Sequence, residues 1–233
     1  MPSTLVHMAF AGLLAAALLQ THFDRRAVLV VMAVTAVPDL DSFIALVSVA
    51  GHRTVLHTYL LPIGLGVLLA ADTRLREESF VRGRWGDWGV AVGWMSLLCL
   101  AVAGIGLDFI EAGVNPLWPL HDQFYVLNGK IELSDKRGLI QTFVEVDLDG
   151  GGSGGGGDGS GGGSDAGGGG PSVAPESLGS SQEVNMSTGI DPDPDGNQED
   201  PERVFPIARA GWQLHLLVTG FAVTAARLWR EDD

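Results

Sequence analysis

The stretch "VPDLDSFIALVSVAGHRTVLHT", residues 37–58, places two aspartates and two histidines in and around segments that otherwise have the composition of membrane-buried helices. Burying a carboxylate in hydrocarbon costs several kcal/mol unless it is paired or bound to another group. The stretch therefore predicts a polar site inside a membrane protein. Its four polar residues of interest are Asp39, Asp41, His52 and His57.

The apolar residues of the chain gather in runs of about twenty, the length of helix that crosses a bilayer. Hydrophobic residues make up 46% of the 233 residues, and the mean hydropathy is +0.23, which is high for a chain with a net charge of −14. We therefore predict an all-α integral membrane protein with about five transmembrane helices. The predicted spans are residues 4–20, 27–49, 55–71, 88–107 and 208–228.

Arginines in the short loops predict the orientation of these helices. They follow the first, third and fifth spans, so an odd number of crossings places all of them on one side. The positive-inside rule makes that side cytoplasmic. We expect a multi-pass plasma-membrane protein with its N-terminus and residues 108–209 outside and its C-terminus in the cytoplasm.

The charge balance limits the partners and suggests the source. Acidic residues outnumber basic residues 28 to 14, and only Lys130 and Lys136 are lysines. Such a bias suits a chain that stays soluble in strong salt, so we expect a halophilic archaeon. It argues against nucleic acid as a partner, because phosphate binding needs basic patches. The single cysteine, Cys99, excludes a disulfide within the chain.

The long segment before the last span has two parts. Residues 117–149 alternate apolar and polar side chains around Asn128-Gly129, which predicts a β-hairpin of two or three short strands. Residues 150–205 are rich in Gly, Ser, Pro and Asp and cannot bury a core, so they predict a disordered acidic linker. The predicted domains are a four-helix membrane metal-site domain (1–116), an extracytoplasmic β-rich segment (117–149), the linker (150–205) and a C-terminal transmembrane helix with a short tail (206–233).

The predicted topology collects seven ionisable residues in the outer half of the bilayer. Acids and imidazoles at one depth can share a divalent cation, which neutralises the carboxylates. A His/Asp mixture suits zinc, manganese or iron better than calcium, and we favour zinc. A metal with an open position generates hydroxide from bound water near neutral pH. The seven are His7, Asp39, Asp41, His52, His57, Asp108 and His215.

Spacing leaves the role of each residue open. Asp39 and Asp41 would point about 200° apart on an unbroken helix. Pro38 is expected to kink or restart the helix there and could turn both carboxylates to one site. Otherwise one is a ligand and the other holds a backbone amide or a ligating imidazole.

Each residue also has an ordinary reading when it is taken alone. A single buried histidine is more often structural than ligating, and Asp108 could simply cap a helix. His215, beside Trp212 and Gln213, also fits an interfacial position. We read His22 and His121 as ordinary polar residues.

Four motifs together resemble the membrane-bound metal-dependent hydrolases, also described as LexA-binding, inner-membrane-associated hydrolases, and suggest a haloarchaeal-type member. The resemblance covers roughly residues 1–120. It implies functional positions at His7, Asp39, Asp41, His52, His57 and Asp108. The motifs are "LVHMAFAGLLAA", "VPDLDS", "GHRTVLHT" and "GLDFIEAGVNPLWPL".

The chain departs from the pattern of that family at Gly104, where the family usually has a histidine four residues before the last aspartate. "HRTVLHT" also lacks the glycine that commonly follows His-Arg. Either His121 or His215 completes the site, or the metal is bound more weakly, or the activity has been lost.

Residues and resemblance together predict a membrane-embedded metal-dependent hydrolase. The expected substrate is a membrane lipid or an amphipathic phosphoester, attacked at the outer leaflet by metal-activated water. Asp41 is the expected general base or the residue that orients a ligand. The alternative is a non-catalytic protein whose polar cluster handles ions or protons, or stabilises the bundle, with a decayed hydrolase site. The expected metal ligands are His7, Asp39, His52, His57 and Asp108.

Overall fold

The computed structural model describes residues 2–44, 52–127, 131–134, 138–141, 176–181, 184, 188–193, 198 and 200–232. The chain forms two units. The first joins Met1–Val126 with Ser177–Asp233, and the second is Leu127–Glu176.

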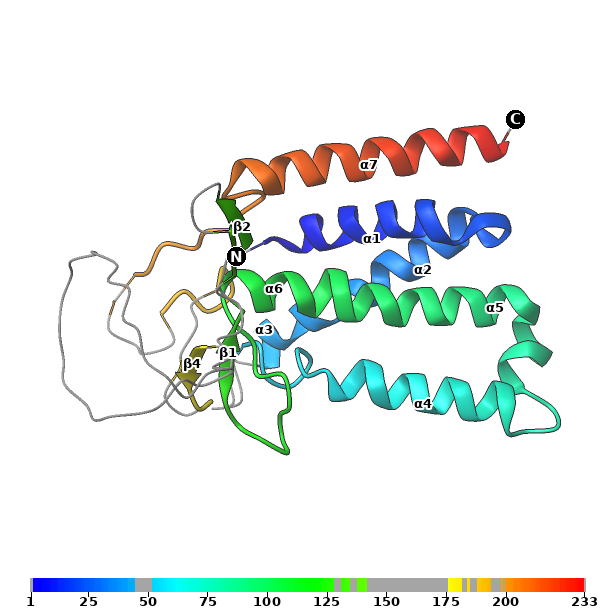
Figure 1. The fold of residues 1–233 in the computed structure, drawn as a ribbon, viewed down its shortest axis with the longest axis horizontal. Coiled ribbons are helices and arrows are strands. Elements are labelled where there is room, and N and C mark those ends of the chain that lie inside the picture. The colour runs from blue at the N-terminus through cyan, green and yellow to red at the C-terminus, as the bar shows by residue number, and fades with distance from the viewer. Residues whose placement is uncertain are drawn as a thin grey trace. The chain divides into compact units, whose positions relative to one another are not determined.

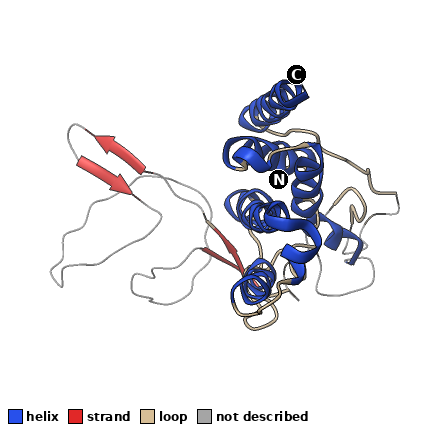
Figure 2. Cartoon of the chain, turned by 90° about the vertical axis from the view of Figure 1, so that its right-hand side faces the viewer, coloured by secondary structure: helices blue, strands red, loops and turns tan. Residues whose placement is uncertain are grey.

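The first unit is a bundle of helices. Figure 1 shows α1, α2, α4, α5 and α7 running alongside one another, and Figure 2 shows the bundle from one end. Small and apolar side chains such as Ala15, Val31 and Cys99 fill the space between α1, α2 and α5. The helices are α1 (Thr4–Leu18), α2 (Arg25–Thr35), α3 (Asp41–Ile44), α4 (Leu60–Arg74), α5 (Phe80–Cys99), α6 (Gly106–Glu111) and α7 (Gly211–Asp232).

A helix lies at each of the five predicted spans, so the mostly helical fold is confirmed. Within the described residues, only the continuous helical stretch Phe80–Glu111 is by itself long and apolar enough to cross a membrane. A second span results if Arg25–Thr35 and Pro38–Ile44, which meet at a bend of 43°, are taken as one. The crossing of the membrane by all five helices stays a prediction.

The helices of the bundle expose large apolar side chains, whereas a water-soluble protein mostly exposes polar ones. On α2 and α4, Leu29 and Leu68 are each 67% exposed and Val67 is 63% exposed, whereas His57 and Asp41 are fully buried. Large apolar side chains exposed in this way are unfavourable in water and fit contact with lipid or another apolar phase. Together with the apolar stretch Phe80–Glu111, they indicate a membrane protein.

Helices α1 and α7 lie side by side although they are about 200 residues apart in the sequence (Figures 1 and 2). Gly220 packs directly on the backbone of Ala9, as small residues do where helices approach closely. The Ser3 hydroxyl donates a hydrogen bond of 2.6 Å to the Ile207 carbonyl at one end of this pair. The Arg227 guanidinium donates a hydrogen bond of 2.9 Å to the Gln20 carbonyl at the other.

Two irregular helical turns position the polar residues. Pro38 lacks an N–H and breaks the helix after α2, and the short 3₁₀ helix η2 (Pro38–Leu40) redirects the chain into α3. This confirms the break expected at Pro38. A π-helix, η3 (Leu100–Ile105), joins α5 to α6. Such turns are frequent at functional sites because they displace side chains from the regular helical positions.

The short strands and the hairpin predicted within residues 117–149 are present, whereas the Asn128-Gly129 pair lies outside the described residues. Strand β1 (Phe124–Val126) pairs with β4 (Glu176–Gly179), and Tyr125 also exchanges two backbone hydrogen bonds with Val114. The backbone groups of β1 therefore bond to β4 and Val114, and β1 does not pair with β2. The hairpin forms later, between β2 (Ile131–Ser134) and β3 (Gly138–Gln141), with Ile131 opposite Gln141.

Part of the region expected to be a linker has described structure. Within residues 150–205 the structure contains β4, and it also describes residues 188–193 and 200–205. Residues 150–175, with the glycine-rich run, lie outside the described residues. The predicted division into four domains stays a prediction.

Candidate metal centre

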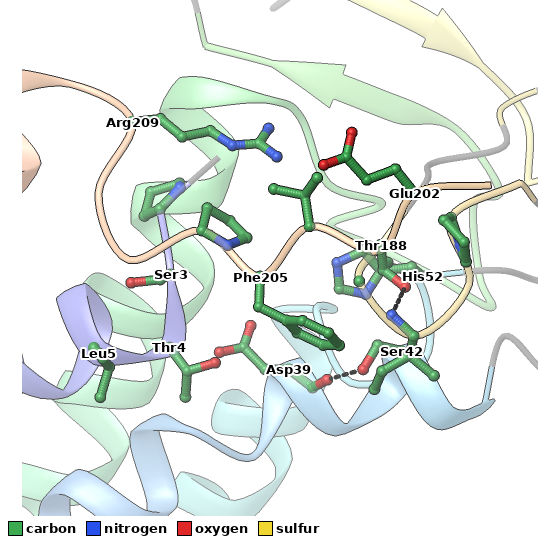
Figure 3. Close-up of a pocket in the computed structure, with 16 residues that line it drawn as sticks. Ser3, Thr4, Leu5, Asp39, Ser42, His52, Thr188, Glu202, Phe205 and Arg209 are labelled. Carbon is green, nitrogen blue, oxygen red and sulfur yellow. Dashed lines mark hydrogen bonds between the residues drawn. The ribbon is translucent and has the colours of Figure 1, made fainter.

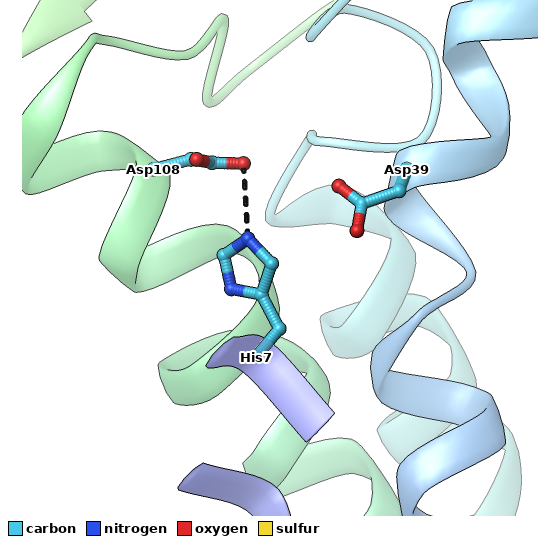
Figure 4. A group of neighbouring side chains, drawn as sticks. All are labelled: His7, Asp39 and Asp108. Atoms are coloured by element: carbon cyan, nitrogen blue, oxygen red, sulfur yellow. Dashed lines mark ion pairs between the residues drawn. The ribbon is translucent and has the colours of Figure 1, made fainter. Parts of the chain in front are cut away.

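Three side chains from three elements converge at the end of the bundle where α3 and α6 lie. They are His7 on α1, Asp39 on η2 and Asp108 on α6 (Figure 4). One nitrogen or oxygen atom from each lies within 4.8 Å of those of the others. His7 and Asp108 are buried, and Asp39 is half-buried. A buried His/Asp group with these distances could hold a metal ion.

The orientation of His7 is fixed by the π-helix. Its Nδ1 lies 2.6 Å from the Ala103 carbonyl oxygen, which can only accept a hydrogen bond, so Nδ1 carries the proton. The other ring nitrogen, Nε2, is then the lone-pair atom, and it lies 3.6 Å from Asp108 Oδ2. A backbone carbonyl that fixes the tautomer in this way is the usual support of a metal-ligating histidine.

Asp41 is the hub of the second part of the cluster. Its Oδ1 accepts a hydrogen bond of 2.6 Å from His52 Nδ1, and its Oδ2 accepts one of 2.7 Å from His57 Nδ1. The backbone N–H of Arg53 donates a third, at 2.9 Å. Both imidazoles are thereby turned so that their Nε2 atoms point away from Asp41. A carboxylate–histidine pair of this kind orients an imidazole toward a metal.

The two Nε2 atoms have different surroundings. His57 Nε2 lies 3.0 Å from Asp108 Oδ2, which connects this pair of histidines to the His7 group. His52 Nε2 is buried and has no hydrogen-bond partner among the described residues. The two rings meet edge to face, with centroids 5.5 Å apart.

Arg53 supplies a counter-charge that the sequence analysis did not assign. Its side chain is 1% exposed, and its guanidinium donates a hydrogen bond of 3.0 Å to Asp108 Oδ1. Its φ of 69° is left-handed, an unusual conformation for a residue with a side chain. The signal that could have identified it is an arginine between two histidines next to apolar segments, where an ionisable residue needs a partner.

Residues 113–116, which follow α6, support the turn that carries Arg53. Gly113 accepts a hydrogen bond of 3.3 Å from the Arg53 guanidinium, and Asn115 N–H donates one of 3.1 Å to the Arg53 carbonyl. The Pro116 carbonyl accepts hydrogen bonds from Thr58 Oγ1 and Tyr59 N–H. The "GVNP" run therefore holds the "HRTVLHT" turn in place, a role that its sequence alone did not reveal.

The charges of the cluster match a divalent cation. Asp39, Asp41 and Asp108 contribute three negative charges and Arg53 contributes one positive charge, so the formal charge is −2 when the histidines are neutral. A buried charge of this size needs compensation. One divalent ion supplies it, as do protons on the histidines.

A cavity of about 410 Å³ adjoins the cluster (Figure 3). Asp39, Ser42 and His52 line it from the side of the candidate centre. Two of the atoms without a hydrogen-bond partner among the described residues, Asp39 Oδ2 and His52 Nε2, belong to these lining residues. Solvent or a ligand in the cavity can therefore contact Asp39 and His52 of the candidate centre.

The structure brings together the six residues at the motif positions. The two histidines that the sequence offered to complete the site, His121 and His215, lie apart from them. His121 is exposed and lies 2.8 Å from the Tyr125 hydroxyl, and His215 is exposed on α7. Gly104 lies close to the end of α2, since a Cβ there would lie 3.1 Å from the Thr35 carbonyl oxygen. A side chain at this position would therefore require η3 or the end of α2 to shift.

Asp122 stabilises the edge of the site. It accepts hydrogen bonds of 2.6 Å from Asn115 Nδ2 and 2.7 Å from the Ser181 hydroxyl. Burial raises the pKa of Asp122, but the hydrogen bonds from Ser181 and Asn115 outweigh it and hold this pKa below its ordinary value. The chain after β4 is thus tied to the segment that supports the Arg53 turn.

Comparison with known proteins gives one match. The model of the YdjM inner membrane protein family matches residues 1–156, which include all the residues of the candidate centre. No curated protein and no solved structure matches the chain. The family description names a membrane location and no activity, so it agrees with the membrane character of the bundle and leaves the chemistry to the site.

Proposed function

We propose that this chain, which belongs to the YdjM inner membrane protein family, is a membrane-embedded hydrolase that uses a divalent metal ion at the candidate centre. A divalent ion held there would lower the pKa of a bound water and act as a Lewis acid toward the substrate. Zinc is the favoured metal, and manganese and iron are alternatives, because the donors are imidazoles and carboxylates. The proposed ligands are His7, Asp39, His52, His57 and Asp108.

One observation carries this proposal. His7 Nε2, Asp39 Oδ2 and His52 Nε2 are buried atoms without a hydrogen-bond partner among the described residues. Their neighbours fix the two histidines so that Nδ1 is the donor, which leaves a lone pair on each Nε2. Buried acceptors without donors are costly. A metal ion can satisfy those of His7 and Asp39, which lie with Asp108 in one group of ligand atoms within 4.8 Å of one another, and His52 adds a further unpartnered nitrogen at the cavity.

The residues have distinct roles in the proposed reaction. Asp41 orients His52 and His57, because both of its oxygens already accept their hydrogen bonds. Of the two roles that the sequence left open for Asp41, this geometry favours the orienting one. Asp39 belongs to the candidate ligand group and also lines the cavity, so it is the candidate ligand that an entering molecule can contact. Arg53 holds Asp108 in position through their ion pair.

The proposed substrate is a lipid or another amphipathic phosphoester of the outer leaflet. The cluster belongs to the end of the bundle opposite the arginine-rich turn after α4, which the positive-inside rule assigns to the cytoplasm. A cavity at this depth is accessible to molecules that partition into the membrane. The outward orientation and the halophilic source remain predictions from the sequence.

Elemental analysis of the purified protein tests the proposal. We expect about one zinc, manganese or iron per chain in the wild type, and none in the His52→Ala/His57→Ala double variant. The matched control is His121→Ala/His215→Ala, which removes two exposed histidines and should keep the metal. A wild-type protein that folds and carries no metal after expression in metal-supplemented medium would exclude the proposal.

A non-catalytic role is the second candidate, and the Asp108 contacts favour it. Arg53 already pairs with Asp108, and a doubly protonated His57 would donate to both Asp41 and Asp108. The cluster would then be a buried ion-pair network that stabilises the bundle. This candidate predicts a metal-free protein whose melting temperature does not change when a chelator is added.

A further inference from the structure

We propose that residues 188–193 and 200–209 form the wall that selects the substrate in the cavity over the candidate metal centre. We further propose that this wall selects a phosphoester with a small apolar group. The segment lies outside residues 1–156, which the family model matches. The inference rests on the proposed function, because the candidate ligands Asp39 and His52 line the same cavity.

The cavity is enclosed from two sides. The start of the chain contributes Ser3 and Leu5, and the later segment contributes Ile190, Phe205 and Arg209 (Figure 3). A volume of about 410 Å³ is at the lower end of the range for small-molecule sites. It suits a headgroup or a small phosphoester. The later segment thus decides what can reach the candidate ligands.

Hydrogen bonds fix this wall to the helices that carry the candidate ligands. The Ser3 hydroxyl, just before α1, donates to the Ile207 carbonyl at 2.6 Å. The Gln213 side chain accepts a hydrogen bond of 2.8 Å from Arg209 N–H and donates one of 3.0 Å to Glu111 on α6. Because α1 carries His7 and α6 carries Asp108, the wall keeps a fixed position relative to the centre.

The chemistry of the wall indicates its ligand. Figure 3 shows the Arg209 guanidinium and the Glu202 carboxylate pointing toward one another above Phe205. Among the described residues, the Arg209 guanidinium has no ion-pair partner, and it can bind phosphate oxygens in a bidentate manner. The Phe205 side chain is 68% exposed, and Figure 3 shows it pointing away from Arg209, toward Asp39 and Ser42. A cation and an aromatic ring that line the same cavity fit a phosphate group attached to an apolar group.

Binding of two probes to the detergent-purified full chain tests the inference. Phenyl phosphate represents a free phosphoester, and dihexanoyl phosphatidate represents a lipid headgroup; benzyl alcohol is the uncharged comparison. We expect Arg209→Gln to weaken binding of the preferred phosphate probe about tenfold, and Phe205→Ala to weaken it about fivefold. Glu202→Gln should strengthen it about threefold, because it removes a repelling charge. Benzyl alcohol binding should not depend on Arg209.

Arg230→Gln, at the other end of α7, is the control that removes the same charge. Equal phosphate binding in Arg209→Gln and Arg230→Gln would overturn the inference, as would wild-type binding of benzyl alcohol as strong as that of either phosphate probe. Metal content measured on the same samples separates this result from the proposed function. If the protein carries metal but probe binding does not depend on Arg209, only the inference about the wall is rejected. If probe binding depends on Arg209 but the protein carries no metal, only the proposed hydrolase function is rejected.

Discussion

The two ends of the helical bundle hold charged residues in opposite ways. At the end with α3 and α6, Asp41, Arg53 and Asp108 are at most 1% exposed, and each contacts at least one other member of the cluster. At the other end, Asp72 pairs with the largely exposed Arg76 and caps α5 through the N–H groups of Phe80 and Val81. Burial makes every partner necessary at the first end, whereas water can replace any partner at the second.

This difference teaches which residues carry function. The Asp72 contacts complete a helix terminus and need no ligand. The buried end includes atoms of His7, Asp39 and His52 that have no hydrogen-bond partner among the described residues. Stability alone does not explain buried groups that lack partners, so the buried end is where a ligand is expected.

The largest expected effect comes from removing the buried cation. Arg53→Met leaves Asp108 charged and short of a partner, which should cost about 3–5 kcal/mol of stability. Arg76→Met, at the other end, should leave the melting temperature almost unchanged. Thermal unfolding in detergent measures both. Equal melting temperatures in the two variants would show that the Arg53–Asp108 pair does not support the fold. Adding Asp108→Asn to Arg53→Met should restore part of the loss.

The next effect is on metal affinity. Asp41→Asn keeps the shape of the side chain but supplies an N–H where an imidazole N–H must be accepted, so His52 or His57 loses its orientation. Loss of such an orienting carboxylate lowers metal affinity about 10- to 100-fold. Asp72→Asn makes the same change outside the cluster and should leave the affinity unchanged. Competition with a zinc-binding dye gives both values, and an unchanged affinity in Asp41→Asn would remove Asp41 from the centre.

The sequence predicted the helices and the members of the cluster better than their contacts. Runs of apolar residues and the position of Pro38 determine where helices lie and break, and these are local properties. The depth argument brought His7, Asp41 and Asp108 to one end because charges in apolar segments must be satisfied together. These parts could be predicted because each depends on one short segment.

Contacts between distant segments could not be predicted in this way. The pairing of β1 with β4 and the hydrogen bond from Ser181 to Asp122 join residues more than 50 positions apart. The turn signal at Asn128-Gly129 gave no indication that β1 pairs with β4 and with Val114. The role of Arg53 depends likewise on Gly113 and Asn115, which no periodicity connects to it.

A smaller difference in stability is expected between glycine-to-alanine substitutions at the two ends of the bundle. Gly104→Ala places a Cβ 3.1 Å from the Thr35 carbonyl oxygen and 3.5 Å from Pro38, so η3 and the end of α2 must separate slightly. The net cost should be about 1–2 kcal/mol. Gly83→Ala meets no atom within 4 Å and should stabilise its helix by about 0.5–1 kcal/mol. Opposite shifts in melting temperature are expected, and a stabilised Gly104→Ala variant would show that this packing is loose.

The smallest expected effect is on the pH dependence of the melting temperature, and it concerns Asp122, which lies outside the helices. Because the pKa of Asp122 is lowered in the folded protein, its contribution is present above its ordinary pKa of about 4 and is lost as the pH falls through the folded value. Ser181→Ala removes one of the hydrogen bonds that lower this pKa. The melting temperature of Ser181→Ala should therefore lie below that of the wild type at pH 6 and approach it toward pH 3. Asp122 is half-buried, so solvent screens the contribution and the difference should be small.

In an Asp122→Asn background the Ser181 substitution should have no pH-dependent effect. A difference that stays constant between pH 6 and pH 3 would mean that the hydroxyl acts through packing and not through the charge of Asp122.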